Sequence, residues 1–172
     1  MNFVEVPNRV QEAELARIMA QYGSPLLRMC YIYLRDVSLA QDAVQDTFLK
    51  ACKKLGSFRH EGTEQSWLMR IAINTCKDYL RMSWFRRVDR KVSLDSLPEA
   101  AHEPAMPDTT VVDEVMRLPA RYKDVVLLRY YQEMKLKHIS ETLGIPIDTV
   151  KSRLKHANKV LRQRLERWYF DE

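Results

Sequence analysis

The sequence predicts an all-α protein of two small helical domains joined by a flexible linker. Apolar residues recur at helical spacing along nearly all of the 172 residues, and no run alternates with the period of a strand. The periodicity fails between about residues 83 and 110, where three prolines lie among acidic and small residues, a composition typical of linkers. We therefore expect an N-terminal domain, a linker and a C-terminal domain at residues 10–84, 85–110 and 111–170.

Composition and charge are those of a globular protein with a polyanionic partner. Hydrophobic residues make up 46% of the chain and charged residues 30%, which argues against a disordered chain. The net charge is +5, and two basic blocks, residues 1–87 and 119–167, flank an acidic stretch. This distribution indicates two surfaces for a polyanion separated by a spacer.

Targeting signals, metal sites and catalytic motifs are not indicated. No apolar run reaches the length of about 18 residues that spans a bilayer, and the N-terminus has acids in place of the apolar segment of a secretory signal. The three cysteines form no CxxC pair and the four histidines lack metal-ligand spacing, which favours a reducing cytoplasm. Phosphate-binding loops and nucleophile motifs are also missing, so we expect no catalytic residue, metal or cofactor.

The N-terminal domain is predicted to hold three amphipathic helices. The first covers residues 15–34, with a break at Pro25 and the Gly–Ser pair before it. The second begins with Ser38 as its N-cap. A polar loop at residues 56–65 precedes the third helix at residues 66–82.

The C-terminal domain is predicted to contain a helix-turn-helix. Pro119 stands near an earlier helix start, where its missing N–H costs nothing. A short amphipathic helix ends at Gly144, which tolerates the positive φ of a helix stop. Ile145 is expected to fill the angle between the two helices, and Asp148 or Thr149 to cap the second one. The buried stripe of that second helix is predicted to be Val150, Leu154, Ala157 and Leu161.

The outward face of the second helix carries the main candidate DNA-binding residues. Polar and basic side chains crowd its N-terminal half, an arrangement that the major groove accepts. Lys151 and Arg153 are long enough to reach guanine edges, whereas other cations would approach phosphates. The alternative is a helix whose charges are only solvated, because short helix–Gly–helix patterns also occur by chance. The candidates are Lys151, Ser152, Arg153, Lys155, His156 and Lys159.

Two polar surfaces of the N-terminal domain have both structural and functional interpretations. Residues 41–50 place acidic and amide side chains opposite an apolar stripe, and the helix dipole alone is sufficient to explain the acids. The next helix combines Trp67 with Arg70 and Asn74, an aromatic, a cation and an amide that could hold unstacked bases. A single tryptophan at helical spacing is, however, more commonly a core residue.

The order of these blocks resembles the extracytoplasmic-function (ECF) sigma factors of bacteria. Four segments, in the family's order and spacing, carry the resemblance over about residues 15 to 167: DAVQDTFLKACKKLGSFR, QSWLMRIAINTCKDYLR, LPARYKDVVLLRYY and ISETLGIPIDTVKSRLKHA. The resemblance implies a minimal two-domain specificity subunit that binds core RNA polymerase and directs promoter-specific transcription initiation, with no catalytic residues of its own.

The resemblance also assigns partners to the candidate surfaces. The helix matching DAVQDTFLKA implies contact with the clamp helices of the largest polymerase subunit. The positions concerned are Asp42, Gln45, Asp46 and Phe48. The following loop and helix imply capture of melted promoter DNA. The positions there are Trp67, Arg70 and Asn74. The helix-turn-helix implies recognition of the duplex upstream element, and an anti-sigma factor covering both domains is a further implied partner.

A different class of protein remains as an alternative. A stand-alone repressor or activator would bind duplex DNA as a dimer and would need a dimerisation surface. No heptad pattern or spare apolar helix is evident for that purpose, so a monomer is expected.

Overall fold

The computed structural model describes residues 9–57, 62–89 and 109–170, and its described elements are all helical, as predicted. The N-terminal half comprises α1 (Arg9–Leu34), α2 (Val37–Lys54), the short η1 (Leu55–Ser57) and α3 (Glu64–Asp89). The C-terminal half comprises α4 (Thr109–Met116), α5 (Ala120–Val126), the π-helical η2 (Leu127–Tyr131), α6 (Leu136–Leu143) and α7 (Ile147–Phe170). α3 extends into the predicted linker, most of which lies outside the described residues.

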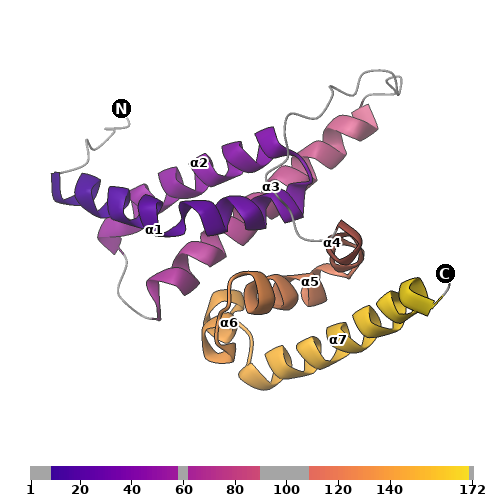
Figure 1. Cartoon of the computed structure of the whole chain (residues 1–172). Coiled ribbons are helices and arrows are strands. Elements are labelled where there is room, and N and C mark those ends of the chain that lie inside the picture. Colours follow the sequence, from indigo (N-terminus) through magenta and orange to yellow (C-terminus); the bar gives the residue numbers. More distant parts are fainter. Residues whose placement is uncertain (1–8, 58–61, 90–108, 171–172) are drawn as a thin grey trace.

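The helices form two bundles that touch each other (Figure 1). In the first, α1, α2 and α3 contact one another, and in the second, α7 contacts α4, α5 and α6. The bundles meet where α3 contacts α6 and where α1 contacts α4 and η2. The candidate DNA-contacting helices of the two halves, α3 and α7, therefore belong to bundles in direct contact.

Each bundle has its own set of fully buried apolar side chains. In the N-terminal half the largest are Ile18, Leu26, Met29, Ile32, Leu68 and Met69. In the C-terminal half they are Val112, Val115, Leu127, Leu128, Met134 and Ile139. The predicted stripe of α7 is confirmed at Val150, Leu154 and Ala157, which are buried, while Leu161 is half-buried.

The predicted break in the first helix does not occur. α1 continues through Pro25 to Leu34. A proline inside a helix removes one hydrogen bond and crowds the preceding turn, at a cost of about 3 kcal/mol. Ile18 before the proline and Leu26 after it are both fully buried. Because the helical segments before and after Pro25 both contribute side chains to one core, tertiary packing outweighs the local preference for a break.

Asp36, and not Ser38, caps α2. Arg35 adopts a left-handed φ of 55°, and its N–H bonds to the backbone oxygen of Tyr31 at 2.7 Å, which ends α1. The Asp36 carboxylate then accepts a hydrogen bond from the N–H of Leu39 at 2.8 Å. The helix begins one residue before Ser38, so that the predicted cap lies inside the first turn.

α7 also begins earlier than predicted. Its first residue is Ile147, and the N–H of Val150 bonds to the backbone oxygen of Pro146 at 3.1 Å. Asp148 and Thr149 are therefore helical residues and not caps. The carboxylate of Asp148 nevertheless lies in the first turn, where its negative charge interacts favourably with the positive end of the helix dipole.

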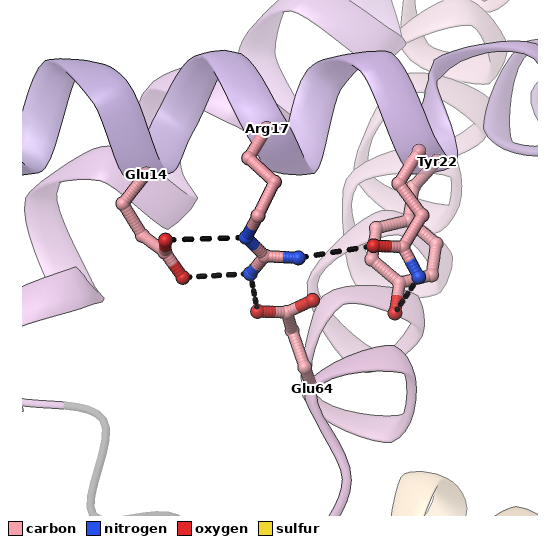
Figure 2. A network of polar contacts seen from close by, with 5 residues as sticks. Glu14, Arg17, Tyr22 and Glu64 are labelled. Carbon is pink, nitrogen blue, oxygen red and sulfur yellow. Dashed lines mark hydrogen bonds and ion pairs between the residues drawn. The ribbon is translucent and has the colours of Figure 1, made fainter.

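Arg17 of α1 forms an ion pair with the first residue of α3. Its guanidinium is shared between Glu14 of the same helix and Glu64, the first residue of α3 (Figure 2). Thr63, next to Glu64, caps α3 by accepting a hydrogen bond from the N–H of Ser66 at 3.1 Å. The first turn of α3, from which the candidate DNA-contacting residues follow, is thus fixed relative to α1.

Candidate nucleic-acid interface

The turn between α6 and α7 has the predicted glycine geometry. Gly144 lies at φ 65° and ψ 37°, and its N–H bonds to the backbone oxygen of Ser140. The N–H of Ile145 shares that oxygen at 3.2 Å, and the Ser140 hydroxyl donates to the backbone oxygen of Ile145 at 2.5 Å. Ile145 is half-buried and packs against the core, as expected for a residue that fills the angle between the helices.

We expect Gly144→Ala to destabilise the protein by about 1–2 kcal/mol, because a side chain in the left-handed region meets its own backbone. A Cβ at this position would have no heavy atom within 4 Å, so backbone conformation is the cause that remains. The matched control is Gly23→Ala inside α1, where a Cβ is also unobstructed. There a gain of about 0.5–1 kcal/mol is expected. Urea unfolding measures both changes, and a gain at residue 144 would contradict the interpretation.

Most predicted DNA-binding residues of α7 project into solvent. Lys151, Ser152, Lys155 and Lys159 are exposed, and we call these four residues the basic face of α7. His156 is also exposed, and its ring stacks on Tyr122 of α5, with the ring centroids 4.6 Å apart. The N-terminal half of α7 can therefore present cations and hydroxyls to a DNA groove without rearrangement of its own bundle.

The candidate residues of α3 are engaged in contacts within the protein. Trp67 is half-buried and packs against the core, in agreement with the structural interpretation of this residue. Arg70 is exposed, but its guanidinium donates to the backbone oxygens of Glu141 and of Thr142, the latter at 2.9 Å. In this arrangement Nε and Nη2 of Arg70 donate to the end of α6, and this contact orients the side chain.

A cavity of about 480 Å³ lies between α3 and the C-terminal helices. Arg70 and Asn74 line it from α3 and Arg153 from α7, so predicted DNA-binding residues of both halves face one space. Arg153 is accordingly half-buried, unlike the basic face of α7. Lys77 and Asp124 also line the cavity. Sequence spacing could not predict this grouping, because it depends on how the two bundles meet.

The residues predicted to bind polymerase differ in accessibility. Asp42 and Gln45 of α2 are exposed. Asp46 is half-buried and accepts a hydrogen bond from the Tyr79 hydroxyl of α3 at 2.7 Å. Phe48 is only 5% exposed and belongs to the core. In the free chain Phe48 therefore does not present its side chain at the surface, unlike Asp42 and Gln45.

Leu49 is a surface residue that the sequence interpretation missed. It is 55% exposed and lies one turn after Gln45 and two turns after Asp42. These three residues form one stripe on α2, which we call the α2 face. The available signal was the position of Leu49 outside the apolar stripe of its helix, which leaves it unexplained by the core.

We expect the phenol of Tyr79 to titrate with a pKa of about 12, above the ordinary 10.0. Burial is the largest cause, followed by the hydrogen bond to Asp46. Because the folded-state pKa is the higher one, the associated stability is fully present below pH 10 and is lost as the pH rises toward 12. Ultraviolet titration measures the pKa, with Tyr79→Phe identifying the transition. Asp46→Asn is expected to lower it, and an unchanged pKa would contradict a role for this carboxylate.

Neither a metal-binding cluster nor a membrane-spanning helix is found among the described residues. Within the three described ranges, no three or more His, Cys, Asp or Glu side chains are grouped so that they could hold a metal ion. Among the described helices, none combines the length and the apolar character that a membrane crossing requires.

Comparison with known proteins assigns both halves. Residues 18–86 match sigma-70 region 2, and residues 110–161 match sigma-70 region 4. The chain is 30% identical over 154 residues to the RNA polymerase sigma factor SigV of Bacillus subtilis, which covers 90% of this chain and 92% of the relative. It is 29% identical over 164 residues to the ECF RNA polymerase sigma factor SigW of the same bacterium, covering 87% and 88%. To the ECF RNA polymerase sigma factor SigM of Mycobacterium tuberculosis it is 30% identical over 151 residues, covering 87% and 76%.

The helical fold, the helix-turn-helix and the two matched regions define a sigma factor of the sigma-70 class, a non-catalytic subunit through which RNA polymerase initiates transcription. The chain belongs to the ECF RNA polymerase sigma factor family. Two solved structures share its fold: CnrH in complex with the cytosolic domain of CnrY, with a TM-score of 0.67, 19% identity and coverage of 94% of this chain and 98% of CnrH; and RpoE of Bartonella quintana in complex with the anti-sigma factor NepR, with a TM-score of 0.70, 22% identity and coverage of 92% and 98%.

Proposed function

We propose that this sigma factor binds its promoter through two separate surfaces while α2 binds the polymerase. The α2 face binds the clamp helices of the largest subunit of core RNA polymerase. Arg70 and Asn74 of α3 contact the melted promoter-proximal element, and the basic face of α7, together with Arg153, reads the upstream element as duplex DNA. The protein acts as a monomer in the cytoplasm, where the polymerase transcribes.

The observation that carries this proposal is the exposure of the α2 face within the part of the chain matching sigma-70 region 2. A single exposed leucine is ordinary on a protein surface. Leu49, however, continues a line begun by Asp42 and Gln45, and an apolar contact among polar ones is the usual composition of a protein interface. None of the three is needed for the core, so a partner explains their arrangement better than folding does.

We also propose that an anti-sigma factor keeps the protein inactive until it is needed. CnrH was solved in complex with the cytosolic domain of CnrY, and RpoE with the anti-sigma factor NepR. The fold shared with both supports a regulator of this kind for the present chain.

Run-off transcription with purified core polymerase on genomic fragments tests the proposed mechanism. Defined transcripts are expected only when both the chain and the core enzyme are present, and the chain is expected to be retained on immobilised core polymerase. A duplex-binding repressor or activator would instead form dimers on symmetric sites without binding core. That outcome would reject the proposed assignment of the α2 face.

A further inference from the structure

The cavity between α3 and the C-terminal helices is rich in positive charge. Its lining includes four cationic side chains, of which α3 contributes Arg70 and Lys77, α5 contributes Arg121 and α7 contributes Arg153. Asp124 is the only acidic residue among the described residues that line it. Cations held close together repel one another unless negative charge lies nearby. The lining therefore favours the binding of an anion.

Asp124 does not supply that negative charge to the whole cavity, because Lys77 already neutralises it. Nζ of Lys77 lies 2.6 Å from the carboxylate, and the Tyr33 hydroxyl of α1 also donates a hydrogen bond to it. Asp124 is buried, and a buried carboxylate is costly unless it is paired and hydrogen-bonded in this way. The pair with Lys77 contributes no net charge, so three guanidinium groups remain as the charged groups of the cavity.

These three arginines have no acidic partner among the described residues. Arg70 donates Nε and Nη2 to backbone oxygens at the end of α6, which carry no full charge. The guanidinium of Arg121 lies over the ring of Tyr122, with its central carbon 4.8 Å from the ring centroid. Arg153 is half-buried, and within the described part of the chain its side chain makes no ion pair. All three charges are thus available to a ligand.

The chemistry and the size of the cavity suit a small phosphorylated molecule. A guanidinium presents its N–H groups as a planar fork that matches two oxygens of one phosphate group. Three such forks, from three helices, can engage more than one phosphate group of the same molecule. The volume of about 480 Å³ lies within the range of roughly 300–1,000 Å³ that is typical of small-molecule sites.

A second cavity, of about 440 Å³, adjoins the first along α3. Asn74, Lys77 and Ala120 line both cavities, and Leu80 lines only the second. Leu80 is exposed although it is apolar, and Asn74 is exposed as well. The amide of an asparagine offers both a donor and an acceptor, which is the combination that the edge of a nucleobase requires. The joined cavities therefore have a cationic end and an apolar end, with an amide between them.

We propose that the joined cavities bind a nucleoside triphosphate. Its phosphate chain lies against Arg70, Arg121 and Arg153, and its base lies beside Asn74 and Leu80. The ligand is bound and not consumed, since the chain is a non-catalytic subunit. Duplex DNA is the competing occupant of the arginines, because its backbone carries the same phosphate groups. The proposal goes beyond the proposed function and does not depend on it, since it concerns the free chain.

Calorimetric titration of the full-length chain tests the ligand class. The ligands are ATP, GTP, inorganic tripolyphosphate and the nucleosides adenosine and guanosine, all without divalent cations so that the phosphate groups keep their full charge. We expect one nucleotide to bind per chain, at least about tenfold more tightly than tripolyphosphate or either nucleoside. Tripolyphosphate carries at least as much charge as a nucleotide, so charge alone would make it the tighter ligand.

Three variants test the two ends of the site. Arg121→Gln and Arg153→Gln each remove one guanidinium and should weaken nucleotide binding about tenfold or more, since hydrogen bonds between charged groups are lost. Leu80→Ser should weaken nucleotide binding about threefold or more and leave tripolyphosphate binding unchanged. Arg162→Gln is the control, because it removes an exposed charge of α7 that pairs with Glu166 outside both cavities. Circular dichroism verifies that each variant is folded.

Three outcomes would overturn the proposal. The first is a nucleotide affinity that neither arginine variant changes. The second is tripolyphosphate binding as tightly as the nucleotides, which would leave the apolar end without a role. The third is no nucleotide binding together with an Arg121→Gln variant that binds duplex DNA evenly more weakly on all sequences, which would assign the arginines to the DNA backbone. Failure of the chain to bind core polymerase would count only against the proposed function.

Discussion

A chain carrying Asp42→Lys together with Leu49→Ser is expected to bind core RNA polymerase at least about 100-fold more weakly than the parent. Burying a leucine side chain contributes about 1.5–3 kcal/mol, and truncating one member of a buried charged pair costs about 2–5 kcal/mol. Even the lower values together exceed the roughly 2.8 kcal/mol that correspond to a 100-fold change. Both residues are exposed, so unfolding stability should change by no more than about 0.5 kcal/mol.

The control for this variant is Glu12→Lys with Met19→Ser on α1. It makes the same kinds of change at an exposed acid and at an apolar residue that is 47% exposed, neither of which belongs to the α2 face. Titration of labelled protein with core polymerase compares the two chains. Equal affinities would show that the α2 face is not the contact. Asp46 is deliberately left unchanged, because its hydrogen bond to Tyr79 would confound the result.

Helix identity could be predicted from the sequence because apolar periodicity is a local property. The buried stripe of α7 and the glycine stop at Gly144 follow from residue spacing and from the φ that glycine tolerates. The helix starts were less predictable. Asp36 caps α2 because the left-handed Arg35 ends α1 directly before it, and a positive φ at an arginine leaves no mark in the sequence.

Tertiary packing determines the structure at the positions where local residue preference predicts it incorrectly. Pro25 favours a break, yet buried residues on either side of it keep α1 continuous. At the candidate interface, sequence spacing gave most of the outward residues of α7, but Arg153 is half-buried; on α2 it left Leu49, which is exposed, outside the apolar stripe, whereas Phe48, which is buried, was predicted as a contact. The two are adjacent, and which one faces the core depends on how α2 is rotated against α1 and α3.

The meeting of Arg70 with the end of α6 lay beyond sequence reasoning for a different reason. The hydrogen bonds join residues about seventy positions apart, across a segment without periodicity. Arg70 is a plausible DNA contact from its residue type alone, and the same donors that suit phosphates and bases suit the free carbonyls of a helix end. Residue chemistry therefore identified the donor correctly without identifying which acceptor it has in the free chain.

Arg153→Ala is expected to remove base discrimination at one position of the upstream promoter element. A bidentate contact to a guanine edge is worth about 1–3 kcal/mol, which corresponds to a loss of roughly 5- to 150-fold for the preferred sequence and little loss for others. The measurement is made with the assembled holoenzyme, because Arg153 is half-buried at the cavity in the free chain. Binding to a library of upstream sequences gives the profile, and an unchanged profile would show that Arg153 reads no base.

Lys159→Ala is the comparison variant, because it tests a phosphate contact where Arg153→Ala tests a base contact. Lys159 is exposed on the basic face of α7, farther from the N-terminal end of the helix than Arg153. As a phosphate contact it should weaken binding by a similar factor on all sequences, and it should reduce the slope of log affinity against log salt by about 1. The two variants must differ in kind and not only in size. If Arg153→Ala also lowers affinity evenly and changes the salt slope, then both residues contact the backbone, and the base-reading positions of α7 have to be sought at Lys151 and Ser152.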